Sequence, residues 1–291
     1  MENKELSIII VNYNNPALIE SCLKSIDKYL SRIKKEIVVV DNNSSIHNLD
    51  AHIKHYPDLR VIYLPANMGF GYANNVGVKN AIGNVLFLMN SDAEFIDNTF
   101  YEMYSAFCSL PLGEMWGARL IWPDGKFQKS YSKEIDLFTF LACYTRCSIF
   151  FRIFFPLNDH KYSKEEFLGE TEVHVVYGAA VLINKLDYQK IGGFSEIFFM
   201  YFEDVDLCDR FRNNLGGTVK FSPITTLIHK ANGSSRGSSI NYIFMKSKYL
   251  YGINKFGYLP MLILIPLDII LVGFEKILRK VICFFGCRLL K

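Results

Sequence analysis

Short apolar runs in the first third of the chain alternate with stretches of helical character. The strands expected from this pattern are Leu6–Val11, Glu36–Val40, Arg60–Leu64 and Val85–Met89. The helices expected between them are Pro16–Leu30, His47–His55 and Tyr72–Ala81. Because the runs are apolar and rich in β-branched residues, they are typical of strands buried on both faces of a parallel sheet. The alternating order predicts a doubly wound, Rossmann-like, mostly parallel central sheet flanked by helices, an α/β fold.

The second half of the chain is less regular. The elements expected there are strands at Met115–Ile121, Val173–Ile183, Val219–Ser222 and Thr226–His229, and a helix at Val205–Asn213. Leu137–Phe155 is apolar and aromatic but is broken by Arg146 and Arg152. This segment is interpreted either as a buried helix or as a face that lies on a membrane.

Polar clusters follow three of the expected strands. The clusters are Asn12-Tyr13-Asn14, Asp41-Asn42-Asn43-Ser44 and Asn90-Ser91-Asp92. In an open α/β sheet, ligands bind outside the carboxyl ends of the strands, so all three clusters are expected at one edge. Asp41 could accept hydrogen bonds from a ribose or a base, although a lone strand-end Asp more often caps a turn. Asp92 is a hard oxygen ligand suited to Mg²⁺ or Mn²⁺, which would bridge to phosphate oxygens.

A glycine-rich turn precedes the third expected helix. Gly69 and Gly71 match two positions of a dinucleotide-binding fingerprint, but Asn74 occupies the third glycine position and the turn follows the third strand. Both departures argue against a nicotinamide cofactor. The glycines either bring backbone N–H groups close to a phosphate or only form a tight turn, and the sequence leaves both interpretations open.

Four acidic residues fall within seven positions, at Glu203, Asp204, Asp206 and Asp209. Acidic residues near a helix N-terminus favour the helix dipole, which is a structural explanation. The six residues before them are strongly apolar, so Glu203 and Asp204 are also candidates for a general base with a shifted pKa. His229, at an expected strand end, is either a ligand of metal or phosphate or a structural residue.

Composition limits the class of protein. The chain has 291 residues, half of them hydrophobic, and a formal net charge of +3. That charge is too small to argue for nucleic-acid binding, and no basic stripe interleaved with aromatic residues is present. The seven scattered cysteines are interpreted as free thiols of a cytosolic protein. A strand is expected directly after the first five residues, so we expect no signal peptide and a folded body in the cytoplasm.

The C-terminal segment has a membrane-like composition. Tyr258–Phe274 is apolar but 17 residues long, with two prolines and Asp268, which is short of the ~20 residues of a spanning helix. Glu275–Lys291 follows with five basic residues and one acidic residue, and helical periodicity places Lys276, Arg279 and Lys280 on one face. This pattern favours a helical tail on an anionic membrane surface, against the alternative of an ordinary core helix.

The clusters, in this order, resemble the family-two inverting glycosyltransferases with a GT-A fold, over about residues 5–255. The matching motifs are Ile10–Asn14, Val40–Ser44, Asn67–Gly77, Leu88–Asp92, Gly178–Ile183 and Gly192-Gly193-Phe194 leading to Phe202–Leu207. The stretch is most similar to the rhamnosyltransferase-like branch, whose members build bacterial surface polysaccharides such as O-antigen or capsule.

The resemblance implies a role for each matching residue. The nucleotide-sugar-binding residues it implies, together with the strand-end clusters, are Asn12, Tyr13, Asn14, Asp41, Asn67, Asn74 and Ser91. Asp92 would be the remaining acid of the family's Asp-x-Asp metal motif, whose first position here is Asn90, and His229 would help to hold Mn²⁺ or Mg²⁺. Asp204 would be the general base, with Glu203 beside it in the catalytic site.

The resemblance also implies an organisation and partners. Residues 1–255 would form the GT-A domain, with a nucleotide-binding half at about 1–95 and an acceptor-binding half at 96–255, and residues 256–291 would form the membrane-associating tail. The donor would be a nucleotide-diphosphate sugar, and the acceptor a glycan linked to polyprenyl diphosphate. The protein would then be peripheral, on the cytoplasmic face of the plasma membrane. From its small net charge, as above, we expect no nucleic-acid partner.

Two other functional classes remain as alternatives. A sugar-1-phosphate nucleotidyltransferase would use a similar sheet, but would carry a basic residue in the loop after the first strand, and Asn12–Pro16 has none. A non-catalytic module that binds sugar nucleotides or glycans would not need the acids at Glu203–Asp206.

Overall fold

The structure, a computed structural model, describes residues 5–45, 49–56, 59–145, 167–231 and 238–286. The strands are β1 (Leu6–Asn12), β2 (Lys35–Asp41), β3 (Leu59–Tyr63), β4 (Val85–Asn90), β5 (Ala93–Phe95), β6 (Glu114–Ile121), β7 (Phe127–Gln128), β8 (Tyr131–Ser132), β9 (Thr171–Glu172), β10 (Val175–Val176), β11 (Ala180–Asn184) and β12 (Thr218–His229). The helices are α1 (Pro16–Tyr29), α2 (Leu49–Ile53), α3 (Phe70–Asn80), α4 (Phe100–Ser109), α5 (Leu137–Thr139), the π-helix η1 (Phe140–Tyr144), α7 (Lys185–Lys190), α8 (Glu203–Leu215), α9 (Ser238–Phe256) and α10 (Tyr258–Gly286).

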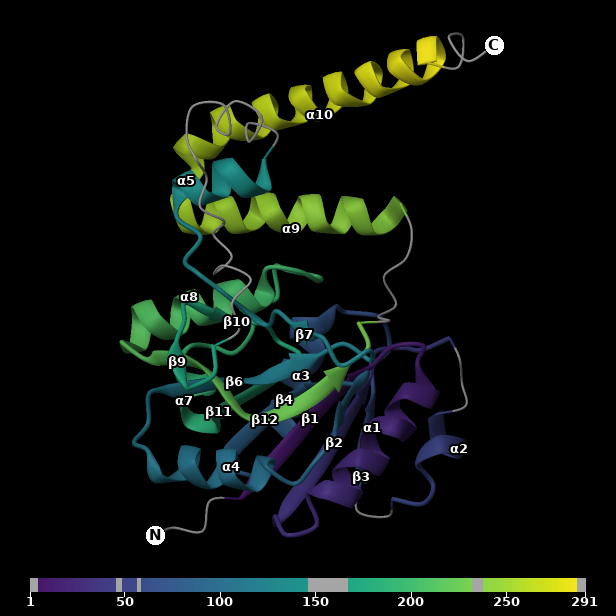
Figure 1. Cartoon of the computed structure of the whole chain (residues 1–291), viewed down its shortest axis with the longest axis vertical. Helices are drawn as coiled ribbons and strands as arrows, with labels where there is room; N and C mark the ends of the chain where they lie inside the picture. Colours follow the sequence, from purple (N-terminus) through teal and green to yellow (C-terminus); the bar gives the residue numbers. More distant parts are fainter. Residues whose placement is uncertain (1–4, 46–48, 57–58, 146–166, 232–237, 287–291) are drawn as a thin grey trace.

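In these ranges the chain forms one ten-stranded sheet in the order β3-β2-β1-β4-β11-β6-β12-β5, with β7 beside β6 and β9 beside β12 (Figure 1). β1, β2, β3 and β4 pair in parallel, as the sequence predicts. The sheet as a whole is mixed, because β11 runs antiparallel to both β4 and β6. The same sheet continues through both of the halves expected on either side of residue 95.

Alternating residues of the buried strands divide the core into two layers. Ile8 and Ile10 of β1 pack with α1, α2 and α4 on one face of the sheet. Ile9, one residue out of phase, packs with α3, α7 and α8 on the other face. A strand has a side-chain period of two, so an apolar run of this kind requires both faces to be covered.

Several expectations for the second half are corrected. Val173–Ile183 is not one strand: β10 and β11 are separated by Tyr177, Gly178 and Ala179, and they belong to different sheets. The two strands expected around Pro223 are one strand, β12, whose register on β6 shifts between Ser222 and Thr226. A proline lacks an N–H donor, so the strand continues past it only with such an irregularity.

The segment Leu137–Phe155 is described only in part. Its first residues form α5 and η1, where Phe140 is buried, and residues 146–166 lie outside the described ranges. α9 was not expected from the sequence, and α10 follows it after Gly257. The two helices stack beyond α8, on the side of the molecule away from the N-terminus (Figure 1). No helix in the described ranges combines the length and hydropathy needed to cross a membrane.

Candidate active site

The first polar cluster forms a buried network at the carboxyl ends of β1 and β2. The amide nitrogen of Asn12 donates to Asp41 Oδ2 at 2.7 Å and to Ser44 Oγ at 3.2 Å. Ser44 donates its backbone N–H to Asp41 Oδ1 and its hydroxyl to Asp41 Oδ2, both at 2.8 Å. Asn12 Oδ1 is buried and has no hydrogen-bond partner among the described residues. A buried acceptor without a partner is rare, and here it marks a position where a ligand could donate a hydrogen bond.

The glycine turn packs against another loop. Asn42 bridges it, since its amide donates to Asn67 Oδ1 at 2.9 Å and accepts from the Met68 N–H at 2.9 Å. Gly69 has φ +92°, and a Cβ added there would lie 2.3 Å from the Phe199 carbonyl oxygen. The first N–H of α3, on Phe70, donates to that same oxygen at 2.9 Å. Close packing against Phe199 therefore explains Gly69, in favour of the tight-turn interpretation, and the Phe70 N–H is not free to bind phosphate.

The third cluster brings Asp92 and His229 together. His229 Nε2 lies 3.2 Å from Asp92 Oδ1 and 3.2 Å from the amide nitrogen of Asn90. His229 Nδ1 lies 2.8 Å from Gln128 Oε1, an acceptor, so this nitrogen carries the proton. In the tautomer that satisfies this contact, Nε2 faces Asp92 and Asn90 with its lone pair. Asn90 Oδ1 is buried beside them without a partner among the described residues.

These residues fit a divalent ion that is completed by a substrate. An octahedral ion with ligands at 2.0–2.1 Å places neighbouring ligand atoms about 3 Å apart, close to the 3.2 Å between Asp92 Oδ1 and His229 Nε2. Within the described ranges, no group of three or more His, Cys, Asp or Glu side chains could hold a metal on its own. Such ions commonly use one or two protein ligands together with phosphate oxygens and water, so two ligands are sufficient here.

Glu203 and Asp204 begin α8 after a strained turn. Tyr201 and Phe202 have φ values of 71° and 66°, a left-handed conformation that is costly for side chains of this size. Phe202 is held in this conformation by ring contacts with Tyr144, Phe244 and Tyr251. Such a strained backbone is kept only where surrounding contacts hold it in place, and strained residues of this kind are common at active sites.

Burial raises the pKa of both Glu203 and Asp204. Burial first, and the neighbouring charge of Asp204 second, raise the pKa of Glu203 to about 8. Burial also raises the pKa of Asp204, and hydrogen bonds from the N–H groups of Gly178 and Val205, at 3.2 Å and 2.8 Å, oppose that shift. Because the charge of Asp204 raises the pKa of Glu203, Asp204 is the acid of the pair that ionises first, and Glu203 keeps its proton to higher pH. Glu203 Oε2 is buried without a partner in the described part of the chain.

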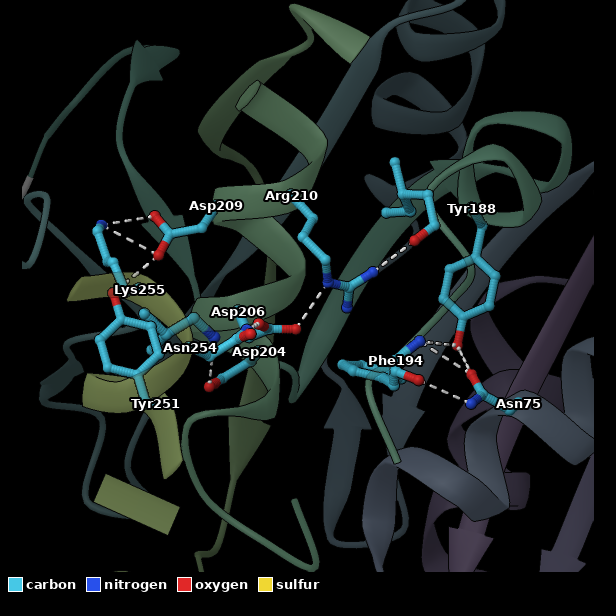
Figure 2. A network of polar contacts seen from close by, with 12 residues as sticks. Asn75, Tyr188, Phe194, Asp204, Asp206, Asp209, Arg210, Tyr251, Asn254 and Lys255 are labelled. Carbon is cyan, nitrogen blue, oxygen red and sulfur yellow. Dashed lines mark hydrogen bonds and ion pairs between the residues drawn. The ribbon is translucent and has the colours of Figure 1, made fainter. Parts of the chain in front are cut away.

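The other two acids of the cluster are structural. Asp206 accepts from Arg210 at 2.7 Å and from Asn254 at 2.9 Å, and Asp209 accepts from Tyr251 at 2.8 Å and from Lys255 at 3.0 Å (Figure 2). Arg210 belongs to α8 itself, and the contacts with Asn254, Tyr251 and Lys255 attach α8 to α9. Only Glu203 and Asp204 remain for chemistry.

Asn75 of α3 fixes the loop that leads to the acids. Its amide oxygen accepts from the Tyr188 hydroxyl at 2.6 Å and from the Phe194 N–H at 2.9 Å, and its amide nitrogen donates to the Phe194 carbonyl at 2.9 Å (Figure 2). Gly193 has φ +66°, and a Cβ there would lie 2.6 Å from Asn75 Oδ1. Asn75, in the first half of the chain, thus holds the loop around Phe194, in the second half, in place.

The segment Gly178-Ala179 joins the acids to the sheet edge. The Ala179 carbonyl accepts from the Asn90 N–H at 3.0 Å, and the Gly178 N–H donates to Asp204 at 3.2 Å. The same two-residue segment therefore connects the end of β4, two residues before Asp92, with Asp204 at the start of α8.

The remaining candidates are placed less directly. Asn14 donates its backbone N–H to Ser44 Oγ at 2.8 Å, and Tyr13 and Ser91 are partly buried at the same edge. Asn74 is buried, and its amide donates to the Phe70 carbonyl inside α3 at 3.0 Å, so no described contact links it to the other candidates. The sequence did not indicate the role of Gln128, which lies on a two-residue strand, or of Asn75.

Two rhamnosyltransferases are similar in sequence to most of this chain. The chain is 24% identical over 261 residues to the N-acetylglucosaminyl-diphospho-decaprenol L-rhamnosyltransferase of Mycobacterium tuberculosis, covering 84% of this chain and 83% of that protein. It is 25% identical over 249 residues to the rhamnosyltransferase WbbL of Escherichia coli, covering 79% and 84% of the two chains.

Solved structures share the fold. GalNAc-T7, in a crystal structure with UDP, GalNAc and Mn²⁺, superposes with a TM-score of 0.60 at 17% identity, over 87% of this chain and 48% of that chain. The mannosyltransferase PcManGT of Pyrobaculum calidifontis, in complex with GDP-Man and Mn²⁺, gives 0.56 at 15% identity, over 86% and 64%. The expected GT-A fold is confirmed.

The profile of glycosyl transferase family 2 matches residues 7–192, which include the Asn12–Asp41, Asn90–Asp92 and Gly178-Ala179 segments of the site. With a GT-A fold, and with rhamnosyltransferases among its relatives, the chain belongs to glycosyltransferase family 2.

Proposed function

We propose that this protein is an inverting glycosyltransferase that moves a sugar from a nucleotide-diphosphate donor to a hydroxyl of a lipid-linked glycan. The observation that carries the proposal is the Gly178-Ala179 segment. It hydrogen-bonds to Asn90 at the end of β4 and to Asp204 at the start of α8, which supports a donor-binding edge and a carboxylate base within one site. A transferase needs both; a binding module needs only the first.

Asp204 is the base in this proposal. Its raised pKa makes it a better proton acceptor than an exposed Asp, and it ionises before Glu203, whose pKa is raised to about 8. Asp204 takes the proton of the acceptor hydroxyl, and the acceptor oxygen attacks the anomeric carbon on the face opposite the nucleotide. The configuration is inverted, and no second ionised carboxylate is needed because no covalent sugar intermediate forms.

The opposite side of the site binds the donor. Asn12 Oδ1 and the nearby Asn14 and Tyr13 are positioned for the nucleoside, with Asp41 holding Asn12 in place. Asp92 and His229 would hold Mn²⁺ or Mg²⁺ together with the donor diphosphate. When bound, the ion neutralises charge on the departing diphosphate.

The acceptor is proposed from the relatives. The mycobacterial relative is named for a decaprenol-linked diphosphate sugar, and other relatives are named for rhamnosyl transfer or O-antigen biosynthesis. A polyprenyl-diphosphate-linked glycan is retained in a membrane, so the enzyme would work as a peripheral protein on the cytoplasmic face of the plasma membrane.

The test is a screen of nucleotide sugars for release of nucleoside diphosphate, with Mn²⁺ or with EDTA, in the presence of membrane lipid extract. The wild-type protein is compared with Asp204→Asn and with Asp124→Asn, a control in an exposed turn. We expect metal-dependent release from one donor, lost in Asp204→Asn and kept in the control. Release that survives Asp204→Asn would refute the base assignment, and donor binding without release would support a binding module.

A further inference from the structure

The first half of α10 exposes an apolar face. Six aliphatic side chains there are between 42% and 80% exposed: Leu259, Leu262, Ile263, Leu267, Ile269 and Ile270. At 100° per residue they fall within an arc of about 160°. Asp268 is on the opposite side of the helix and is fully buried. A helix of a soluble domain normally turns its apolar stripe inward, so this orientation is reversed and needs a cause.

The cause is a buried ion pair. Asp268 Oδ2 accepts from Lys248 Nζ at 2.5 Å and from the Tyr249 hydroxyl at 2.8 Å, both on α9, and both charged side chains are almost fully buried. Met261 of α10 packs against Gly252 of α9. A Cβ added at Gly252 would lie 2.6 Å from the terminal methyl group of Met261. Rotating α10 to bury its aliphatic residues would expose Asp268 and leave Lys248 without this partner. The polar contacts therefore fix which face points outward.

The contacts that orient α10 continue through α9 to α8, the helix that carries the candidate base. α9 is attached to α8 through Asn254–Asp206 and through the contacts of Tyr251 and Lys255 with Asp209 (Figure 2). α8 begins with Glu203 and Asp204. The outward face of α10 and the candidate base are thus held in one chain of packed, hydrogen-bonded helices.

A bilayer surface fits this face better than a second protein copy. The chain after it, Glu275–Lys291, has five basic residues and one acidic residue. Such a charge is attracted to anionic lipid headgroups, whereas a second copy would carry the same basic segment and not a complementary acidic one. The face from Leu259 to Ile270 is roughly 17 Å long, a length suited to lying in the plane of the membrane interface.

We propose that the exposed face of α10 between Leu259 and Ile270 is a membrane-docking surface, which lies in the interface of an anionic bilayer and is turned outward by the Lys248–Asp268 pair. This deepens the proposed membrane location by naming the surface, and it sets the orientation of the active site relative to the bilayer. Binding of lipid through this face requires no donor and no transfer.

The test is co-sedimentation of the full chain with phosphatidylcholine vesicles, with and without phosphatidylglycerol. The test variant is Ile263→Gln/Ile270→Gln, and the matched control is Ile82→Gln/Leu112→Gln, which alters two aliphatic side chains that are similarly exposed but outside α10. We expect tighter binding to the anionic vesicles, a loss of at least about tenfold in the α10 variant, and wild-type binding in the control.

Two outcomes would overturn the inference. One is wild-type binding by the α10 variant, or no binding by the wild-type protein. The other is a change from dimer to monomer in the α10 variant by light scattering, which would show that the face binds a second copy. Because vesicle binding and release of nucleoside diphosphate are measured separately, failure of this inference and failure of the proposed activity can be told apart.

Discussion

The Lys248–Asp268 pair makes a quantitative prediction about the attachment of α10. The two side chains are 2% and 1% exposed, with the Nζ and Oδ2 atoms 2.5 Å apart. At an effective dielectric constant of 20 their attraction is about 7 kcal/mol, and desolvation of the two ions offsets it by several kcal/mol each. The net value of the intact pair is therefore small. Removing one partner is different, because the other charge stays buried, at a cost of about 3–5 kcal/mol.

We expect Asp268→Ala and Lys248→Met each to detach α10, and the double variant to restore most of its attachment. Hydrogen exchange of the α10 amides, followed by mass spectrometry, measures this directly. A loss of 3 kcal/mol lowers protection more than about 100-fold, or abolishes it if α10 is less stable than that. Amides of β1 and β4 should not change in any of the variants.

The matched control is Lys24→Met, which breaks the exposed Lys24–Glu20 pair of α1. Solvent and salt screen exposed pairs of this kind, so exchange in α1 should change little. The reasoning is refuted if Asp268→Ala leaves the protection of α10 at its wild-type value, or if the double variant is as unprotected as the two single variants.

Three further predictions concern the active site. The pKa of Glu203 rises from 4.5 to about 8 on folding, so the folded state binds more protons between these values and loses stability as pH increases through them. Glu203→Gln should therefore gain stability over wild type as pH rises from 5 to 9, by up to roughly 4 kcal/mol in urea unfolding. Gly69→Ala should cost more than about 3 kcal/mol, and Gly192→Ala only about 1–2, since both have positive φ but only Gly69 lacks space for a Cβ. Asn75→Ala should cost about 1–3 kcal/mol and lower kcat, because it leaves the Tyr188 hydroxyl without this acceptor.

Each of these predictions has its own counter-result. For Glu203, a pH-independent difference between the variant and wild type would show that the carboxyl titrates normally. For the glycines, equal losses of unfolding free energy would remove the steric explanation. For Asn75, the control is Tyr188→Phe, which removes the hydroxyl that donates to Asn75 and should lower the free energy of unfolding by less than Asn75→Ala does. An unchanged kcat in Asn75→Ala would show that the loop does not need this support.

The parallel half of the fold was predictable because each strand is a continuous β-branched run. β1 to β4 were expected within one or two residues of their observed ends. The break between β10 and β11 was not, because Val173–Ile183 is almost uninterrupted in its apolar character and only Gly178 marks it. α9 was missed because Ser247 and Lys248 are buried at positions where a pattern of apolar residues would be expected.

The site was predictable where local sequence carries the geometry. Asp41 and Asp92 follow strands, so topology alone places them at one edge. Asn75 could not be found in this way, because the residues it bonds, Tyr188 and Phe194, are 113 and 119 positions away. Asp204 could be separated from Asp206 and Asp209 only once their partners on α9 were known.

The contact between Gly69 and Phe199 bears on how such an enzyme could be recombined. The Phe70 N–H and the Phe199 carbonyl meet as backbone atoms, and the glycine is required only because it has no side chain. The contact itself therefore requires only the absence of a side chain at position 69. A chimera that takes residues 1–95 from a relative with a different donor should still seat its third helix on the loop before Glu203, provided that a glycine stands at position 69 and an asparagine at position 75.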